Sequence, residues 1–310
     1  MTSQQTATVP TSVRSVHLGR GPVDQRHQAR RRGWRGLFRA IRRHWSLALG
    51  VAIVFVCCAF AAGAPLLSPY SPDAQNMANV LRGPSAGHPF GTDEFGRDTL
   101  SRIFFGARLT LLASSLAVVL AAVAGCAIGL ITGYFGGLLD ALVNRVIDVL
   151  FALPVILLGI AVVAILGPGE VSVVVAIALA SVPNFARVSR SANIPEKERE
   201  YVVAAHVAGA STRYIIVRTL LPNLIGPLTV LLSLGFAYAV LYEASLSFLG
   251  LGARPPTPEW GVMLSTARDF LFQSPWSAFF PGVSIFVLVF SLNLVGDGLS
   301  GLVDPHRRKR

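Results

Sequence analysis

The sequence predicts an all-α membrane protein with six transmembrane helices. Of its 310 residues, 53% are hydrophobic and only 14% are charged, a composition too apolar for an ordinary water-soluble domain. Several apolar runs reach the roughly 20 residues that a helix needs to cross the hydrocarbon layer. We place the six spans at 46–67, 109–135, 148–167, 171–192, 224–248 and 277–299.

The fourth span is the weakest, because its uncharged stretch ends at Ala186, before Arg187. Parity supports it. With five spans, the basic stretch 307–310 would lie across the membrane from the Arg-rich N-terminal region. With six, both termini and the loop 193–223 share one side, which then holds most of the 27 Lys and Arg residues. The positive-inside rule assigns that side to the cytoplasm.

The domain organisation follows from the same pattern. We expect residues 1–44 to form a disordered, Arg-rich cytoplasmic tail, because large apolar residues are few there. A transmembrane domain at 45–306 and a basic cytoplasmic tail at 307–310 follow. Within the domain we expect a first span at 46–67, an external segment at 68–108, a five-helix core at 109–304 and a loop at 193–223. The net charge of +11 reflects this topology and attraction to membrane lipids, rather than nucleic-acid binding.

The loop between the fourth and fifth spans carries a charged stretch that predicts a short helix. Pro195, followed by Glu196 and Glu198, is typical of a helix start, since proline fits the first turn and carboxylates complement its positive end. We therefore expect a helix at 196–208. Gly209 suits the left-handed turn that ends a helix.

Small side chains define one face of this expected helix. Ala204, Ala205 and Ala208 lie on it, with Tyr201 three residues before Ala204 on the same side. Such a face lets the surface of another protein approach the backbone closely, so we expect a docking element on a bend between two spans. Ser211 can cap the helix that follows.

Four polar side chains fall within or near the spans, where such groups are costly and usually face a cavity or a partner. They are Asp148, Glu243, Asn293 and Asp297. Asp148 follows Arg145 by three residues, which favours an ion pair within one helix. Glu243 is a candidate for lining a solute path, with a structural ion pair or a helix-end hydrogen bond as the alternative.

Two external segments are expected to be ordered. Between residues 91 and 102, glycines alternate with charged residues, which indicates tight, hydrogen-bonded turns. In the second segment a proline-rich stretch precedes Glu259, Trp260 and Gly261, and a short helix is expected at 263–272. Because Trp buries a large area and keeps a polar N–H, we predict that these three residues contact an external partner.

The sequence gives no indication of catalysis or of a cofactor. It has no glycine-rich phosphate-binding loop ending in Gly-Lys-Ser or Gly-Lys-Thr. No His or Cys cluster has metal-ligand spacing, and Cys57, Cys58 and Cys126 all fall inside apolar runs. We therefore expect neither an enzyme nor a metal site.

The charged loop resembles the cytoplasmic signature of permease subunits of bacterial ATP-binding-cassette importers. That signature reads Glu-Ala-Ala, three residues, Gly, nine residues, Ile, one residue and Leu-Pro. The matching residues here are Val203, Ala204, Ala205, Gly209, Thr219, Leu221 and Pro222. The spacing is kept throughout, with Val203 in place of Glu and Thr219 in place of Ile.

Further motifs narrow the resemblance, over residues 45–306, to the C-type permeases of dipeptide, oligopeptide and nickel importers. These motifs are Gly91-Thr92-Asp93, Gly96-Arg97-Asp98, Gly106-Ala107-Arg108, Glu243-Ala244-Ser245-Leu246-Ser247-Phe248-Leu249-Gly250 and Asp304-Pro305. The resemblance implies the permease fold of a type I ABC importer, in a multi-pass protein of the bacterial plasma membrane.

The resemblance also implies partners and docking residues. A B-type permease subunit would complete a heterodimeric pore, two cytoplasmic ATP-binding subunits would drive it, and an extracytoplasmic solute-binding protein would deliver the substrate. The helix at 196–208 would be the coupling helix, seated in a groove of the ATPase. Its expected docking residues are Glu200, Tyr201, Ala204, Ala205, Ala208, Gly209, Leu221 and Pro222.

The resulting hypothesis is a permease subunit of an ATP-driven importer of dipeptides or oligopeptides. Nickel complexes and glutathione stay open as substrates, because similar permeases handle them. An ion-coupled secondary transporter is the main alternative, and it predicts buried acidic residues and repeat symmetry, neither of which is clear in the sequence. A membrane-embedded enzyme would need converging catalytic groups, and we find none.

Overall fold

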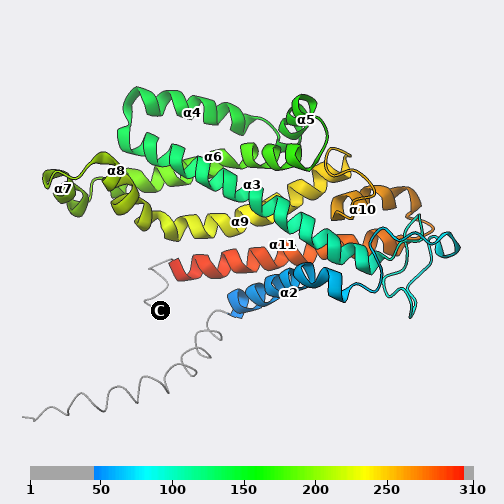
Figure 1. Ribbon diagram of the computed structural model, residues 1–310. Coiled ribbons are helices and arrows are strands. Elements are labelled where there is room, and N and C mark those ends of the chain that lie inside the picture. The colour runs from blue at the N-terminus through cyan, green and yellow to red at the C-terminus, as the bar shows by residue number, and fades with distance from the viewer. Residues whose placement is uncertain (1–44, 304–310) are drawn as a thin grey trace, which may run out of the picture. The chain divides into compact units, whose positions relative to one another are not determined.

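The computed structural model describes residues 45–303 as a bundle of long helices (Figure 1). The predicted tails 1–44 and 307–310, and the Asp304-Pro305 motif, lie outside the described residues. Five described helical segments are long and apolar enough to cross a membrane. They are α2 (Trp45–Leu67), α3 (Thr99–Phe135), α6 (Glu170–Glu196), the segment Thr212–Phe248 that contains α9 (Leu221–Phe248), and α11 (Pro275–Val303).

The remaining predicted span, at 148–167, is not one straight helix. It is divided between α4 (Gly137–Ala152) and α5 (Val155–Leu166), which meet at an angle of 99°. Pro154 causes the break, because it has no backbone N–H and drives Leu153 into an extended conformation. The described part of the chain therefore has six crossings only if this bent pair counts as one.

The core of the bundle is the long contact between α3 and α6, which small residues make close. A Cβ atom added at Gly129 would lie 2.3 Å from the carbonyl oxygen of Ala186, and one at Gly125 would lie 2.6 Å from the Cβ of Phe185. Because hydrocarbon offers helices no hydrophobic drive to associate, such close backbone packing is the main source of their cohesion.

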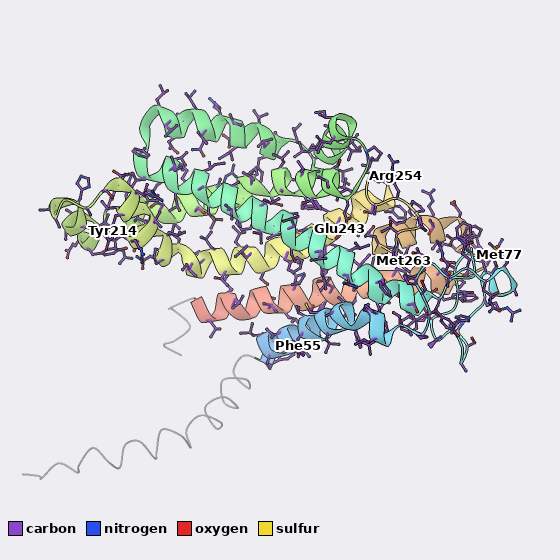
Figure 2. The ribbon with its side chains drawn as sticks, in the orientation of Figure 1. Phe55, Met77, Tyr214, Glu243, Arg254 and Met263 are labelled. Carbon is purple, nitrogen blue, oxygen red and sulfur yellow. The ribbon has the colours of Figure 1, made fainter. Side chains whose placement is uncertain are left out.

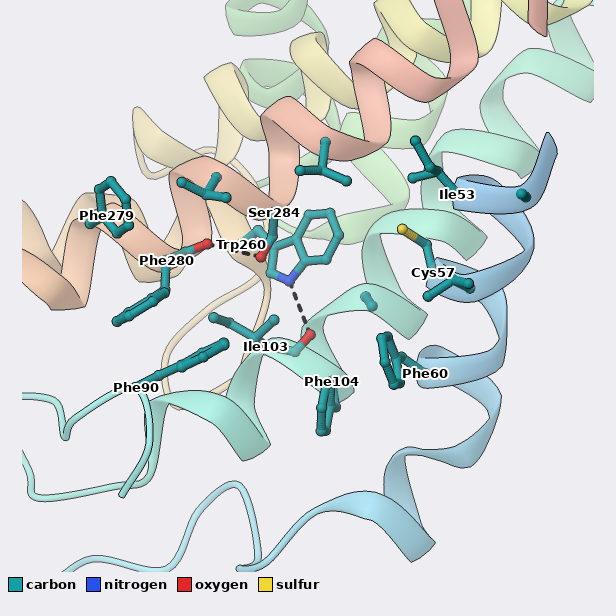
Figure 3. A pocket seen from close by; sticks show the side chains of 15 residues that line it. Ile53, Cys57, Phe60, Phe90, Ile103, Phe104, Trp260, Phe279, Phe280 and Ser284 are labelled. Atoms are coloured by element: carbon teal, nitrogen blue, oxygen red, sulfur yellow. Dashed lines mark hydrogen bonds between the residues drawn. The ribbon is translucent and has the colours of Figure 1, made fainter. Parts of the chain in front are cut away.

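A second group of helices packs on the other side of α3. Here α11 lies between α2 and α9 and contacts both (Figure 1). Their buried side chains form a cluster with α10 (Trp260–Ala267), which includes Leu288 and Val240, both fully buried. An apolar groove of about 510 Å³ opens between α2, α3 and α11 (Figure 3).

The two ends of the bundle carry different structures. One end holds two short helices, α7 (Glu200–Val207) and α8 (Thr212–Tyr214), and the other holds α10 and the segment that leads from α2 to α3 (Figure 1). Tyr214 therefore lies far along the bundle from Met77 and Met263 (Figure 2).

Helices α3 and α10 both begin earlier in the sequence than predicted, and in both cases an acidic side chain caps the first turn. The predicted span 109–135 is the later part of α3, whose first turn is capped by Asp98 through the backbone N–H of Ser101 at 2.8 Å. The helix predicted at 263–272 is α10 followed by a 3₁₀ turn, Arg268–Phe270. Glu259 caps α10 by accepting from the N–H groups of its first turn.

Candidate functional site

The loop between α6 and α9 begins later than the sequence predicts. Pro195 does not start a helix but lies in the last turn of α6, and α7 starts at Glu200. Contacts with α3 hold this turn: Lys197 Nζ donates to the carbonyl of Gly133 at 2.9 Å, and Asn193 Nδ2 donates to that of Leu130 at 2.9 Å. These tertiary hydrogen bonds outweigh the local preference of proline for a first turn.

The small-residue face predicted for this helix is divided between two sides of α7. Ala204 and Ala208 are exposed, as predicted for docking residues, and so is Glu200. Ala205 instead is half-buried and packs against the core of its own chain, beside the buried Val202. Ala205 thus helps to anchor α7 instead of belonging to its exposed face, so the prediction for Ala205 is wrong in this respect.

Two exposed valines belong to the same surface, and the sequence analysis missed them. Val203 is 52% exposed and Val207 is 84% exposed. They lie beside a shallow pocket of about 450 Å³ that Tyr134 and His206 also line. The signal available in the sequence was their apolar character in an otherwise polar loop, which is typical of a contact surface.

The turn after α7 has the predicted geometry. Gly209 has φ +81°, and a Cβ atom placed there would meet nothing within 4 Å, so the backbone conformation alone favours glycine. The side chain of Ser211 caps α8 by accepting from the N–H of Tyr214 at 3.3 Å, as expected. The loop therefore has one defined bend rather than a flexible tip.

Side-chain contacts fix α7 to the start of α9. The Tyr201 hydroxyl donates to the Glu196 carboxylate and accepts from Asn223 Nδ2 at 2.8 Å. Partial desolvation and the neighbouring carboxylate raise the pKa of Tyr201, so the hydroxyl keeps its proton. Leu221 is half-buried against the core, and Pro222 lies exposed in the first turn of α9. Both thus support the loop from the α9 side.

A π-helical turn, Ile215–Leu220, joins α8 to α9. Ile215 and Leu220 are fully buried at its two ends, so this turn is packed into the bundle. Such turns are rare in proteins and frequently occur at functional sites or hinges. The loop 197–222 therefore combines an exposed surface with firm anchors on both sides.

Glu243 does not line a cavity. Glu243, labelled in Figure 2, is 2% exposed, and its carboxylate accepts a hydrogen bond from Ser114 Oγ of α3 at 2.7 Å. The burial of Glu243 favours a structural role, although its hydrogen bond joins two helices and is neither the ion pair nor the helix-end hydrogen bond that was the predicted alternative. Asp148 also differs from expectation: it pairs with Arg187 of α6 at 3.1 Å and not with Arg145.

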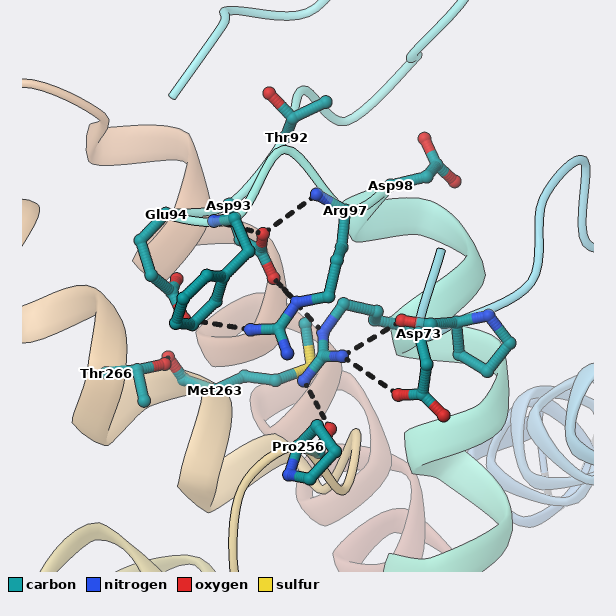
Figure 4. A network of polar contacts seen from close by, with 12 residues as sticks. Asp73, Thr92, Asp93, Glu94, Arg97, Asp98, Pro256, Met263 and Thr266 are labelled. Atoms are coloured by element: carbon teal, nitrogen blue, oxygen red, sulfur yellow. Dashed lines mark hydrogen bonds and ion pairs between the residues drawn. The ribbon is translucent and has the colours of Figure 1, made fainter. Parts of the chain in front are cut away.

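A buried polar network occupies the end of the bundle opposite to α7 (Figure 4). Arg97 binds Asp93 at 2.6 Å and Glu94 at 2.8 Å, and Arg102 lies 3.4 Å from Asp93. Arg102 also donates to the carbonyl of Pro256 at 3.1 Å. Burial and the neighbouring Asp93 raise the pKa of Glu94. The network confirms the predicted tight turns and ties them to the loop before α10.

Glu259, Trp260 and Gly261 are buried in their own chain, so they do not offer a surface to an external partner. Trp260 is 2% exposed, and its indole N–H donates to the carbonyl of Ile103 at 3.1 Å (Figure 3). A Cβ atom at Gly261 would lie 2.6 Å from the carbonyl oxygen of Ala244. Burial raises the pKa of the Glu259 carboxyl, against its hydrogen bonds from backbone N–H groups. These residues dock α10 on α3 and α9.

A cavity of about 420 Å³ lies between α4, α6 and α9, and the sequence analysis did not predict it. Asn184 and Ser181 of α6 line it, together with Tyr238 and Tyr242 of α9, whose rings stack with centroids 6.3 Å apart. Phe151 of α4 closes another wall. Polar and aromatic residues from three separate helices thus line one cavity.

Comparisons with known proteins identify the class to which this geometry belongs. The family of binding-protein-dependent transport system inner membrane components matches residues 125–309, and the N-terminal transmembrane domain of oligopeptide transport permease C matches residues 33–84. The chain therefore belongs to the inner-membrane permeases of binding-protein-dependent ABC transporters. Its N-terminal match places it among the oligopeptide C-type permeases, as the sequence motifs predicted.

Two relatives and one solved structure support this assignment. The dipeptide transport system permease protein DppC of Alkalihalophilus pseudofirmus is 44% identical over 272 residues, which cover 88% of this chain and 90% of that protein. The glutathione transport system permease protein GsiD of Pectobacterium atrosepticum is 42% identical over 284 residues, covering 90% and 93%. An inward-facing structure of the MetNI methionine ABC transporter matches with a TM-score of 0.53 at 19% identity, covering 66% of this chain and 96% of that chain.

These matches confirm the predicted fold and the predicted class. The protein is a multi-pass membrane permease of a binding-protein-dependent importer, and it is a transport component rather than an enzyme. A transporter of this class works with an ATPase and a solute-binding protein. The low identity of the MetNI match supports the fold alone.

Proposed function

We propose that this permease forms one half of a heterodimeric pore that imports short peptides across the bacterial plasma membrane. Relatives at more than 40% identity are named as dipeptide and glutathione permeases, and glutathione is itself a small peptide. A distinct B-type permease forms the other half of the pore, two ATP-binding subunits drive it, and an extracytoplasmic binding protein delivers the substrate.

The observation that carries the ATPase assignment is the exposed apolar surface of α7. Val202 is 4% exposed and anchors the helix, whereas Val203 and Val207 are largely exposed. Exposed apolar groups on a loop beyond the spans are typical of a protein contact. Ala204 and Ala208 on the same helix leave its backbone open to close approach. We assign these four residues to a groove of the ATPase.

This assignment sets the orientation of the chain. The α7 end faces the cytoplasm, where the ATPases are, and with the bent pair α4–α5 as one crossing the start of α2 and the end of α11 share that side. The positive-inside rule gives the same answer, since most Lys and Arg residues fall on the α7 side. The buried network of Asp93 and Arg97 then lies on the external face.

Reconstitution tests both assignments. The purified complex of this chain, a B-type permease, the ATPases and the binding protein should import alanyl-alanine into proteoliposomes when ATP is present. Val207→Asp should leave the chain bound to the B-type permease but release the ATPase, because a carboxylate would be desolvated in the contact. Full uptake without a second permease would contradict the heterodimer, and normal ATPase binding by the variant would contradict the docking surface.

A further inference from the structure

We propose that the cavity between α4, α6 and α9 is a transit site that binds the peptide during its passage, through Asn184, Tyr238 and Tyr242. The inference rests on the proposed function and adds a binding site to it. The cavity measures about 420 Å³, within the range of small-molecule sites, and these three polar residues line its wall.

The position of these polar groups in the membrane is the first argument. Asn184 lies near the middle of α6, and Tyr238 lies well inside α9. Asn184 is exposed and Tyr238 is 57% exposed. Polar side chains at this depth face a partner or a water-filled cavity rather than lipid, because hydrocarbon cannot satisfy their hydrogen bonds. Within residues 45–303, none of the side-chain hydrogen bonds involves Asn184, Tyr238 or Tyr242.

The broken helix beside the cavity is an independent argument. Leu150 and Leu153 line the cavity before the break, and Val155 lines it after the break. The first turn of α5 has no side-chain cap, so its backbone N–H groups are left for other partners. Irregular backbone at membrane depth is tolerated where it lines a water-filled cavity. The break between α4 and α5 therefore lies in the wall of this cavity.

The chemistry of the lining indicates a peptide. A Tyr hydroxyl and an Asn amide can each donate and accept, which matches the alternating N–H and C=O groups of a peptide backbone. The stacked rings of Tyr238 and Tyr242, with Phe151 and Phe185, add apolar surface for side chains. None of the described residues that line this cavity is charged. Recognition through uncharged groups suits a site that must release peptides with different side chains.

Thiol accessibility in the complete reconstituted complex tests the site directly. Cys57, Cys58 and Cys126 are first replaced by Ala, since none of them lines this cavity. Asn184→Cys and Tyr238→Cys then report on the cavity. Ser245→Cys is the matched control, because Ser245 is also on α9 but lines a different groove.

Saturating alanyl-alanine, delivered by the binding protein, should slow modification by a charged methanethiosulfonate at least threefold at positions 184 and 238 and leave position 245 unchanged. Equal rates with and without the dipeptide overturn the proposal. Thiols at 184 and 238 that are inaccessible before peptide is added also overturn it, because the B-type permease would then cover the cavity.

Conservative variants give a second readout that does not depend on the cysteines. Tyr238→Phe and Tyr242→Phe keep the rings and remove only the hydroxyl groups. Each should lower alanyl-alanine imported per ATP by about two- to tenfold, the range that one neutral hydrogen bond contributes. Tyr70→Phe, outside the cavity, should have no effect. Unchanged uptake in both cavity variants overturns this inference alone, whereas a wild-type complex that imports no peptide overturns the proposed function.

Discussion

Gly209→Ala should weaken binding of the ATPase while the bundle stays folded. Gly209 has φ +81° in the turn between α7 and α8, a conformation that L-residues with a side chain rarely adopt. The substitution adds one methyl group, and no atom of the chain lies within 4 Å of where that group would be. The whole effect therefore comes from the backbone and not from a clash.

The size of the effect follows from the cost of left-handed backbone. An L-residue pays about 1–2 kcal/mol in this conformation. In the free protein the exposed turn can relax to another shape, so docking must restore the strained one. At about 1.4 kcal/mol per tenfold, the affinity for the ATPase should fall roughly 5- to 30-fold. Gly209→Asn should lose less, because Asn tolerates positive φ better than Ala.

Equilibrium binding of the isolated ATPase to permease in nanodiscs measures this effect, and Gly137→Ala is the matched control. Gly137 also has positive φ, at +61°, and also has open space around its Cβ position. It is the first residue of α4, outside the loop 197–222. Its replacement should carry the same strain without changing ATPase affinity.

Two outcomes would refute the reasoning about Gly209. Wild-type affinity in Gly209→Ala would mean that the bend is not part of the docking geometry. An equal loss in Gly209→Ala and Gly137→Ala would mean that backbone strain acts through general destabilisation. Thermal unfolding of both variants, followed in the same nanodiscs, separates the second outcome from specific loss of docking.

Four further substitutions have different expected readouts. Ala204→Trp should lower ATPase affinity roughly ten- to hundredfold, since overpacking a close contact costs about 1–3 kcal/mol. Ala205→Trp should instead lower the melting temperature of the permease itself, because Ala205 is half-buried. The reverse pattern would contradict the faces assigned to α7. Arg102→Met should destabilise the fold by about 1–3 kcal/mol, because the carbonyl of Pro256 loses its donor while Asp93 keeps Arg97 as its cation, and an unchanged thermal midpoint would contradict this. Trp260→Phe should cost about 1 kcal/mol in stability through its lost hydrogen bond, yet leave ATPase stimulation by the binding protein intact, and lost stimulation would restore Trp260 as a contact residue.

The sequence was sufficient for the fold class because the membrane imposes a length on each apolar run. Five of the six predicted spans correspond to described helices of spanning length. The break at Pro154 shows where prediction from hydropathy fails. A hydropathy window averages over the residues around Leu153 and carries no information about the direction of the helix axis. Proline limits the backbone there, but the 99° turn is a property of how α5 packs against α6 and α9.

Local rules failed where contacts distant in the sequence decided the outcome. Pro195 is a good helix start by its own chemistry, yet Lys197 bonds the end of α3 and extends α6 past it. Trp260 has the composition of a contact residue, but its N–H finds the carbonyl of Ile103, 157 residues away. Neither partner can be recognised from the residues around the motif.

The cavity was beyond prediction for the same reason. Phe151, Asn184 and Tyr238 belong to three helices, and each residue is unremarkable within its own helix. The single local signal is Tyr238 and Tyr242 one turn apart on α9, which a helical pattern puts on one face. Only the packing of α4 and α6 around that face turns it into a cavity wall.

The loop 197–222 and the cavity are built on the same two helices. α6 runs unbroken from the cavity wall at Asn184 to the end that α7 follows, and α9 runs from the loop to Tyr238. The loop is fixed to both, through Lys197 on the α6 side and Asn223 on the α9 side. A force that moves α7 as a rigid unit must therefore shift the ends of α6 and α9 that adjoin the loop. The two ends can move in the same direction or in opposite directions.

The way α4 is held allows such a shift to change the cavity. Two ion pairs join α4 to α6, Asp140 with Arg190 at 2.5 Å and Asp148 with Arg187 at 3.1 Å. The second pair is more than half exposed on both sides, so it contributes little to stability and can break and re-form. Close packing instead holds α6 to α3. Under the proposed function, ATPase closure would thus act on α6 and α9 as rigid bodies, while α4 follows loosely and the space lined by Asn184 and Tyr238 widens or narrows.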